Sequence, residues 1–70
     1  MSTTERIRIV LIRRKMTVTA LAAAVGLGSR NLGNKLSKDD FRESELQKIA
    51  EALNCTLGIT FTLRDTGETI

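Results

Sequence analysis

The chain has 70 residues, with 11 Lys and Arg against 8 Asp and Glu, one cysteine and no histidine. That length predicts a single small domain, near the size at which a second copy of the chain often adds stability. One cysteine cannot form an internal disulfide, and without histidine the usual Cys/His metal sites are excluded, so we expect a cytoplasmic protein with no metal and no cofactor.

The first helix is predicted over residues 4–16, with Thr3 or Thr4 as its cap. Four residues recur at helical spacing and are expected to trace the inward face: Ile7, Val10, Leu11 and Arg14. Ile9 and Ile12 are expected to widen this face. Three consecutive cations at residues 13–15 fall in its last turn, where they suit the negative end of the helix dipole. A phosphate contact is a secondary role for this cluster.

Two short helices joined by a glycine-containing turn are predicted over residues 18–25 and 29–37. Thr17 is the expected N-cap of the first. Aliphatic residues at i, i+4 spacing form their inward stripes: Leu21 and Val25 on the first helix, Leu32 and Leu36 on the second. Gly26 falls where the first helix must end at positive φ, and the small Ala22 lets the two backbones approach closely. This pattern indicates a helix-turn-helix.

A fourth helix is predicted over residues 42–53, after a polar connection at residues 37–40. Asp40 and Glu43 have the three-residue separation of a capping box, which marks its start. Apolar residues supply its inner stripe: Phe41, Leu46, Ile49, Ala50 and Leu53. Asn54 is expected to stop the helix in the left-handed conformation.

The sequence period changes from helical to alternating at residue 55. Every second residue is then apolar: Cys55, Leu57, Ile59, Phe61 and Leu63. With β-branched residues between them, this predicts a strand over residues 55–64 with one buried face. A hairpin is disfavoured, because only residues 68–70 remain to pair with the strand, and residues 65–70 are expected to be a mobile tail.

A solitary strand leaves its backbone groups unpaired and its apolar face uncovered. We therefore expect a homodimer in which two strands pair antiparallel across a two-fold axis. The residues expected at the dimer interface are Leu57, Ile59, Phe61 and Leu63.

The helix-turn-helix stretch also carries a recognisable set of residues: Thr17, Leu21-Ala22, Gly26-Leu27 and Leu32. With them it resembles the lambda-repressor-like, Cro-type (XRE) family, whose pattern is Thr…Leu-Ala…Gly-Val…Ile. Residues 45–54 resemble the helix that follows the DNA-reading unit in that family, so the resemblance covers about residues 5–54. It implies a mainly α fold of four to five helices. The chain then divides into a DNA-binding domain (1–54), a dimerisation strand (55–64) and a tail (65–70).

The resemblance implies that residues 29–37 are a recognition helix, whose first turn points into the major groove. The outward candidates for base contacts are Ser29, Arg30, Asn31 and Asn34. An arginine can bind guanine through two hydrogen bonds, and an asparagine can bind adenine in the same way. The candidates for phosphate contacts are Thr17, Thr19, Lys35 and Lys38. Gly33 costs about 1 kcal/mol relative to alanine in mid-helix, and its expected benefit is room for DNA or another helix.

Charge is distributed unevenly along the chain. Eight of the 11 Lys and Arg residues lie in the first 38 residues, where Glu5 is the only acid. A basic half that contains the helix-turn-helix suits double-stranded DNA, because Lys and Arg contacts to phosphate supply most of the non-specific affinity. The alternative is that these charged side chains simply lie on solvated helix faces and do not bind a polyanion. The longest apolar run, residues 20–25, is too short to cross a membrane, and the N-terminus lacks the apolar core of a signal peptide.

We therefore expect a sequence-specific transcriptional regulator, a repressor that binds a palindromic operator as a homodimer and has no small-molecule effector. The alternative is a protein-interaction module of the same fold, such as an anti-repressor, an antitoxin or an inhibitor subunit, whose strand adds to a partner's sheet. An enzyme is not expected, because the chain has no histidine and no phosphate-cradling glycine loop with a lysine. Cys55 opens the apolar face of the predicted strand, where a small core residue is expected rather than a nucleophile.

Overall fold

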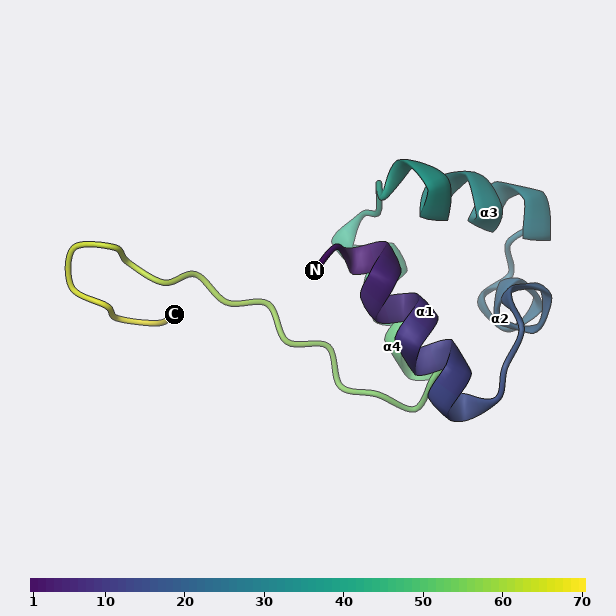
Figure 1. Ribbon diagram of the computed structural model, residues 1–70, viewed down its shortest axis with the longest axis horizontal. Coiled ribbons are helices and arrows are strands. Elements are labelled where there is room, and N and C mark those ends of the chain that lie inside the picture. The colour runs from purple at the N-terminus through teal and green to yellow at the C-terminus, as the bar shows by residue number, and fades with distance from the viewer.

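The computed structural model describes all 70 residues and contains four helices: α1 (Thr3–Arg14), α2 (Val18–Val25), α3 (Ser29–Lys38) and α4 (Glu43–Ala52). The helices gather at one end of the molecule, and the chain after α4 leaves them as a long arm that turns back near the C-terminus (Figure 1). The molecule is therefore elongated, with extents of 43 × 22 × 19 Å. None of the four helices has the length and apolar character required to cross a bilayer.

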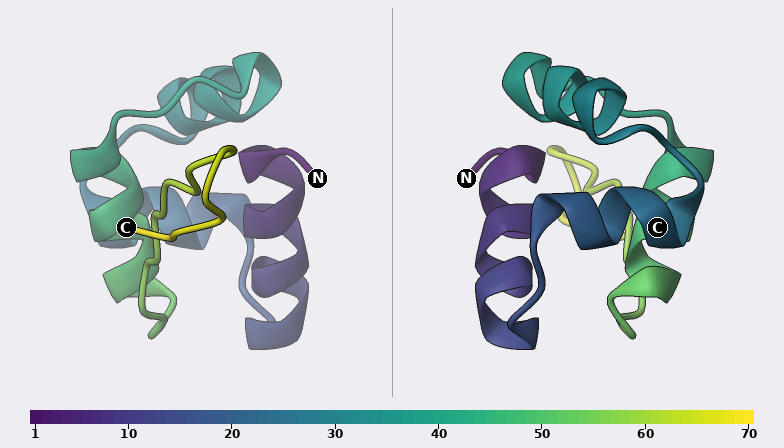
Figure 2. Two further views of the ribbon diagram at one scale, coloured as in Figure 1. Left: turned by 90° about the vertical axis from the view of Figure 1, so that its left-hand side faces the viewer. Right: turned by 90° about the vertical axis from the view of Figure 1, so that its right-hand side faces the viewer.

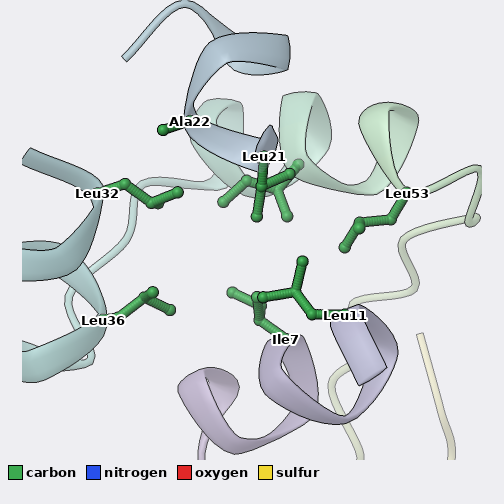
Figure 3. Close-up of a cluster of buried hydrophobic side chains, with 8 residues drawn as sticks. Ile7, Leu11, Leu21, Ala22, Leu32, Leu36 and Leu53 are labelled. Atoms are coloured by element: carbon green, nitrogen blue, oxygen red, sulfur yellow. The ribbon is translucent and has the colours of Figure 1, made fainter. Parts of the chain in front are cut away.

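The core lies between the four helices, and each helix or its end contributes to it (Figure 3). Its eight buried residues are Ile7, Leu11, Leu21, Ala22, Leu32, Leu36, Ile49 and Leu53. Leu21 of α2 and Leu32 of α3 have a relative exposure of 0%. Burial of each such side chain contributes about 1.5–3 kcal/mol, so the core fixes α2 and α3 against each other.

Two of the five aliphatic residues expected on the inward face of α1 are exposed. Ile9 has a relative exposure of 38% and Ile12 of 76%, so the prediction is wrong for both. Successive residues of a helix point about 100° apart, and the core reaches only a narrow stripe of α1 centred on Ile7 and Leu11. A run of consecutive aliphatic residues does not itself show which of them lie on that stripe.

The start of α1 is fixed by a capping box that the sequence analysis missed. Ser2, rather than Thr3 or Thr4, is the N-cap. Its Oγ accepts a hydrogen bond from the backbone N–H of Glu5 at 3.1 Å, and Glu5 Oε1 accepts one from the N–H of Ser2 at 3.4 Å. These reciprocal bonds satisfy two amides that a helix start leaves free.

The end of α1 is joined to the end of α4 by Arg14. Its Nε donates to the carbonyl of Leu53 at 2.9 Å, and its Nη2 donates to the carbonyl of Asn54 at 3.1 Å. The guanidinium thus lies at the negative end of the α4 dipole. α1 itself ends earlier than expected because Lys15 adopts a left-handed conformation with φ of 54°.

α4 begins one residue later than expected and has a different cap. Arg42 is the N-cap, and its N–H donates to Glu45 Oε1 at 2.8 Å. Glu45 therefore supplies the capping carboxylate in place of the expected Asp40–Glu43 pair. The left-handed stop expected at Asn54 is confirmed by its φ of 55°.

The arm over residues 55–64 forms no regular strand within the single chain, and its one bridge is the antiparallel pairing of Thr62 with Thr69. The hairpin that the sequence disfavours nevertheless exists: Phe61 and Ile70 exchange two backbone hydrogen bonds, of 3.0 and 2.8 Å. The prediction that residues 68–70 are too few to pair is wrong, because Gly67, at φ of 78°, helps the chain to reverse within a short turn.

Candidate nucleic-acid interface

The α2–turn–α3 unit forms as predicted, and both ends of α2 are fixed by local bonds. Thr17 is its N-cap, with its side chain accepting from the N–H of Ala20 at 3.1 Å. Gly26 ends the helix at φ of 76°. The N–H of Leu27 then bonds to the carbonyl of Ala22 at 2.9 Å, which closes the turn.

α2 and α3 cross at a steep angle, which leaves α3 on the outside of the domain. Figure 1 shows α2 almost end-on where α3 lies across the view, and Figure 2 shows α3 above α2 at the edge of the molecule. The buried Leu32 and Leu36 face the core, so the opposite side of α3 faces solvent.

All four base-reading candidates are exposed: Ser29, Arg30, Asn31 and Asn34. Arg30, Asn34 and the exposed Lys38 are four residues apart and form one stripe along α3. A polar depression of about 230 Å³ lies over this helix and is lined by Asn31, Asn34, Lys35, Lys38 and Asp40. The face thus offers amide, guanidinium and ammonium groups, which are the donors and acceptors that base edges and phosphates require.

The first turn of α3 has no side-chain cap. Gly28 is the N-cap and has no side chain to offer, so no side-chain acceptor serves the first amides of the helix. Such amides, at the positive end of the helix dipole, suit an anion such as a backbone phosphate. The stretch from Thr17 to Lys38 also contains three cations and no acid.

The phosphate-contact candidates differ in their surroundings. Thr17, Thr19 and Lys38 are exposed, although the Thr17 hydroxyl already caps α2. Lys35 is half-buried, and its Nζ lies 2.7 Å from Glu45 Oε2 of α4. The hydrogen bond from Lys35, with a second from the Arg42 backbone, lowers the pKa of Glu45 below its usual value of 4.5. A phosphate would have to compete with that carboxylate for Lys35.

Two hydrogen bonds from Thr4, which the sequence predicts only as a possible helix cap, hold the C-terminal end of α3 against α1. The Thr4 hydroxyl donates to the carbonyl of Leu36 at 2.8 Å, and the Thr4 N–H donates to Asp39 Oδ1 at 2.8 Å. With the Lys35–Glu45 pair, these bonds join α3 to both flanking helices. No local pattern marks them, because Thr4 and Asp39 are distant in sequence.

The four residues expected at a dimer interface are divided by their exposure in the single chain. Leu57 is half-buried, whereas Ile59, Phe61 and Leu63 have relative exposures of 50%, 74% and 40%. Cys55, expected as a small core residue, is exposed instead. The root of the arm, residues 55–59, lies along the surface of α1 and α4 and does not carry this residue into the core.

Comparison with known proteins gives one family. Residues 6–58 match the family model described as a Cro/C1-type HTH DNA-binding domain. This match spans all of α2, α3 and α4 and most of α1, together with the root of the arm. Neither the curated proteins nor the solved structures that were searched gave a match.

Proposed function

The chain belongs to the Cro/C1-type helix-turn-helix DNA-binding family, and we propose that it is a repressor that binds a palindromic operator as a homodimer. The observation that carries the proposal is the exposed polar face of α3, on a helix that the core holds rigidly at the edge of the domain. Rigid presentation matters because base recognition depends on the side chains being held in register with the groove.

In this proposal, the face of α3 enters the major groove. Arg30 binds O6 and N7 of a guanine, Asn31 and Asn34 bind adenine or bridge through water, and Ser29 contacts the bases at the helix start. A good two-bond contact discriminates by about 1–3 kcal/mol against the wrong base.

Phosphates on either side of the groove are bound by Thr17, Thr19, Lys38 and the free amides at the start of α3. These contacts carry the affinity and set the register, while the base contacts carry the sequence preference. Lys35 joins them only where a phosphate displaces Glu45 from its ammonium group.

The homodimer supplies the second recognition helix. Ile59, Phe61 and Leu63 are exposed apolar residues on one arm, and Leu57 lies at its root. A two-fold axis through paired arms would present two α3 helices to successive major grooves, about 34 Å apart, which is why the operator should be palindromic. No small-molecule effector is included in this proposal.

A protein-interaction module is the second candidate, and the arm is the observation that favours it. An exposed arm with apolar side chains and unpaired backbone groups can add as a strand to the sheet of another protein. In that case the partner would bind the arm, and the polar face of α3 would carry no sequence preference.

Selection of bound duplexes from a random pool, followed by sequencing, tests the first candidate. Wild type is expected to enrich a palindrome at low salt. Arg30→Ala should relax the preference at one guanine per half-site and weaken binding to the enriched duplex by about tenfold to 100-fold in anisotropy titrations. Arg8→Ala is the matched control, because Arg8 lies on the exposed side of α1 outside the helix-turn-helix, and it should keep the same palindrome.

The same experiment separates the two candidates. If wild type enriches no sequence at low salt, the repressor proposal fails. A tight complex with a protein partner, unaffected by Arg30→Ala, would then support the interaction module.

A further inference from the structure

An apolar groove lies between α1 and α4 on the side of the domain from which the arm leaves. It has a volume of about 330 Å³; Val10 of α1, Leu46 of α4 and the root of the arm, residues 55–59, line it. Figure 2 shows α1 and α4 flanking this side of the molecule. Val10 and Leu46 are only half-buried, and Arg6 is the one charged residue in the lining. The groove is therefore an apolar surface with a cation on it.

The hairpin at the end of the arm has one apolar face. Phe61 and Ile70 bond to each other in both directions, which places them opposite each other in the register. Leu63 is opposite Glu68, since its N–H donates to the Glu68 carbonyl at 2.8 Å. Directly opposite residues share a face, as do alternate residues of one strand. This face therefore carries Phe61, Leu63 and Ile70, with Glu68 as its one charged residue, whereas Ile59 precedes the paired residues and lines the groove of its own chain.

The other face of the hairpin carries threonines. Thr62 and Thr69 are opposite each other, with their hydroxyl oxygens 3.4 Å apart. The relative exposures of Phe61 and Ile70 are 74% and 72%, so the apolar face is uncovered in the single chain. An isolated two-stranded ribbon is marginally stable in water, and this one needs a surface to cover it.

We propose that the apolar face of this hairpin covers the α1/α4 groove of a second copy of the chain. The proposal rests on the homodimer of the proposed function and adds to its paired arms a contact between each hairpin and the helices of the other copy. The hairpin does not reach its own groove, because the arm carries it to the far end of the long axis of the molecule (Figure 1). A two-fold axis makes two identical contacts of this kind, and neither groove nor hairpin remains uncovered.

The charges argue for a second copy as the occupant. The groove carries one cation, Arg6, and the apolar face of the hairpin carries one anion, Glu68. Each chain thus carries two complementary surfaces. Both are apolar, and the groove has a positive charge where the hairpin face has a negative one. Apolar burial supplies the affinity, and the pairing of Arg6 with Glu68 fixes the orientation of the hairpin in the groove.

Charge-reversal variants of Arg6 and Glu68 test the proposal, with the dimer dissociation constant measured by sedimentation equilibrium. Arg6→Glu and Glu68→Arg are each expected to raise the dimer dissociation constant about tenfold, because each places like charges together at both contacts. An equimolar mixture of the two variants should form heterodimers with nearly the wild-type dissociation constant, since every contact then pairs opposite charges. Phe61→Ser should dissociate the dimer whether the groove carries Arg6 or the Arg6→Glu substitution, because it removes an apolar contact.

Arg8→Glu is the matched control for charge, because Arg8 is exposed on α1 but does not line the groove. Circular dichroism should show an unchanged helix content for every variant. If wild type is a dimer but the mixture stays as dissociated as the single variants, or Arg6→Glu dissociates no more than Arg8→Glu, the hairpin does not occupy the groove and the homodimer uses another surface. A wild type that remains monomeric at millimolar concentration overturns the homodimer itself, whereas duplex selection tests DNA binding separately.

Discussion

The residues of α3 form two sets, one exposed to solvent and one buried in the core. The exposed set includes Arg30, Asn34 and Lys38. These three point away from the core, while Leu32 and Leu36 on the other side of the same helix are buried. The period of the helix alone separates the two sets. A substitution in the exposed set should therefore change DNA binding with little effect on stability.

Gly33 is the residue of α3 whose identity has no structural explanation within the protein. A Cβ added there would meet no heavy atom within 4 Å, so no neighbouring helix requires a glycine. Gly33→Ala should stabilise the fold by about 1 kcal/mol, because glycine is a poor helix former. Thermal unfolding should show a rise in Tm of about 4–8 °C.

DNA binding by Gly33→Ala gives the second half of that prediction. If the DNA backbone approaches α3 at this position, the more stable variant should bind the selected duplex more weakly than wild type in anisotropy titrations. Equal binding by wild type and Gly33→Ala would mean that Gly33 has no role in the complex. An unchanged or lower Tm would contradict the prediction that a methyl group fits at this position without a clash.

Glu45 couples the stability of the domain to pH. Its hydrogen bond from Lys35 lowers its pKa in the folded state, so the ionised form is favoured by folding. This contribution is present above the usual carboxyl pKa of 4.5 and is lost as pH falls through the lower folded value. Urea unfolding between pH 6 and pH 3 should therefore show a larger loss of stability for wild type than for Glu45→Gln.

The matched control is Glu51→Gln, since Glu51 lies on the same helix and is exposed without an ion pair. It should keep the pH dependence of wild type. Equal slopes for wild type and Glu45→Gln would show that the Lys35–Glu45 pair does not contribute in solution, which leaves Lys35 free to bind phosphate.

At the scale of elements, the sequence predicts α2 best because both of its ends are set by local chemistry. Thr17 supplies the N-cap and Gly26 the left-handed end, and the predicted bounds of 18–25 are those of the structure. The predicted starts of α1 and α4 each differ from the structure by one residue, because Ser2 rather than Thr3 or Thr4 caps α1, and Glu45 rather than Glu43 caps α4. Ser2 with Glu5, and Arg42 with Glu45, have the same three-residue separation, and at α4 the Asp40–Glu43 pair has it as well.

Contacts between elements could not be predicted, because no local pattern encodes them. Arg14 was assigned to the last turn of its own helix, yet its guanidinium bonds to carbonyls that follow α4. The link from Thr4 to Asp39 is of the same kind. For the candidate interface this means that the sequence identifies which residues of α3 are exposed, while the fold shows that Lys35 is held by a neighbouring helix.

At the scale of the whole molecule, the arm is the segment in which most apolar side chains remain exposed in the single chain. The alternating pattern of residues 55–64 predicts a strand with one buried face, but the single chain forms only one isolated bridge there, at Thr62. The pattern does not identify the surface that covers this face, and in the single chain Ile59, Phe61 and Leu63 remain exposed. The helical domain has a complete core, whereas the apolar face of the arm is uncovered. This combination is expected of a chain that buries such a face against another chain.

The central claim is that α3 reads DNA, and amide chemical shifts recorded during titration with the selected duplex test it most directly. The account predicts the largest shifts in residues 29–34, smaller ones around Thr17 and Thr19, and none in the hairpin beyond residue 60. Shifts confined to the arm, with the amides of α3 unchanged, would contradict the account and identify the arm as the binding surface.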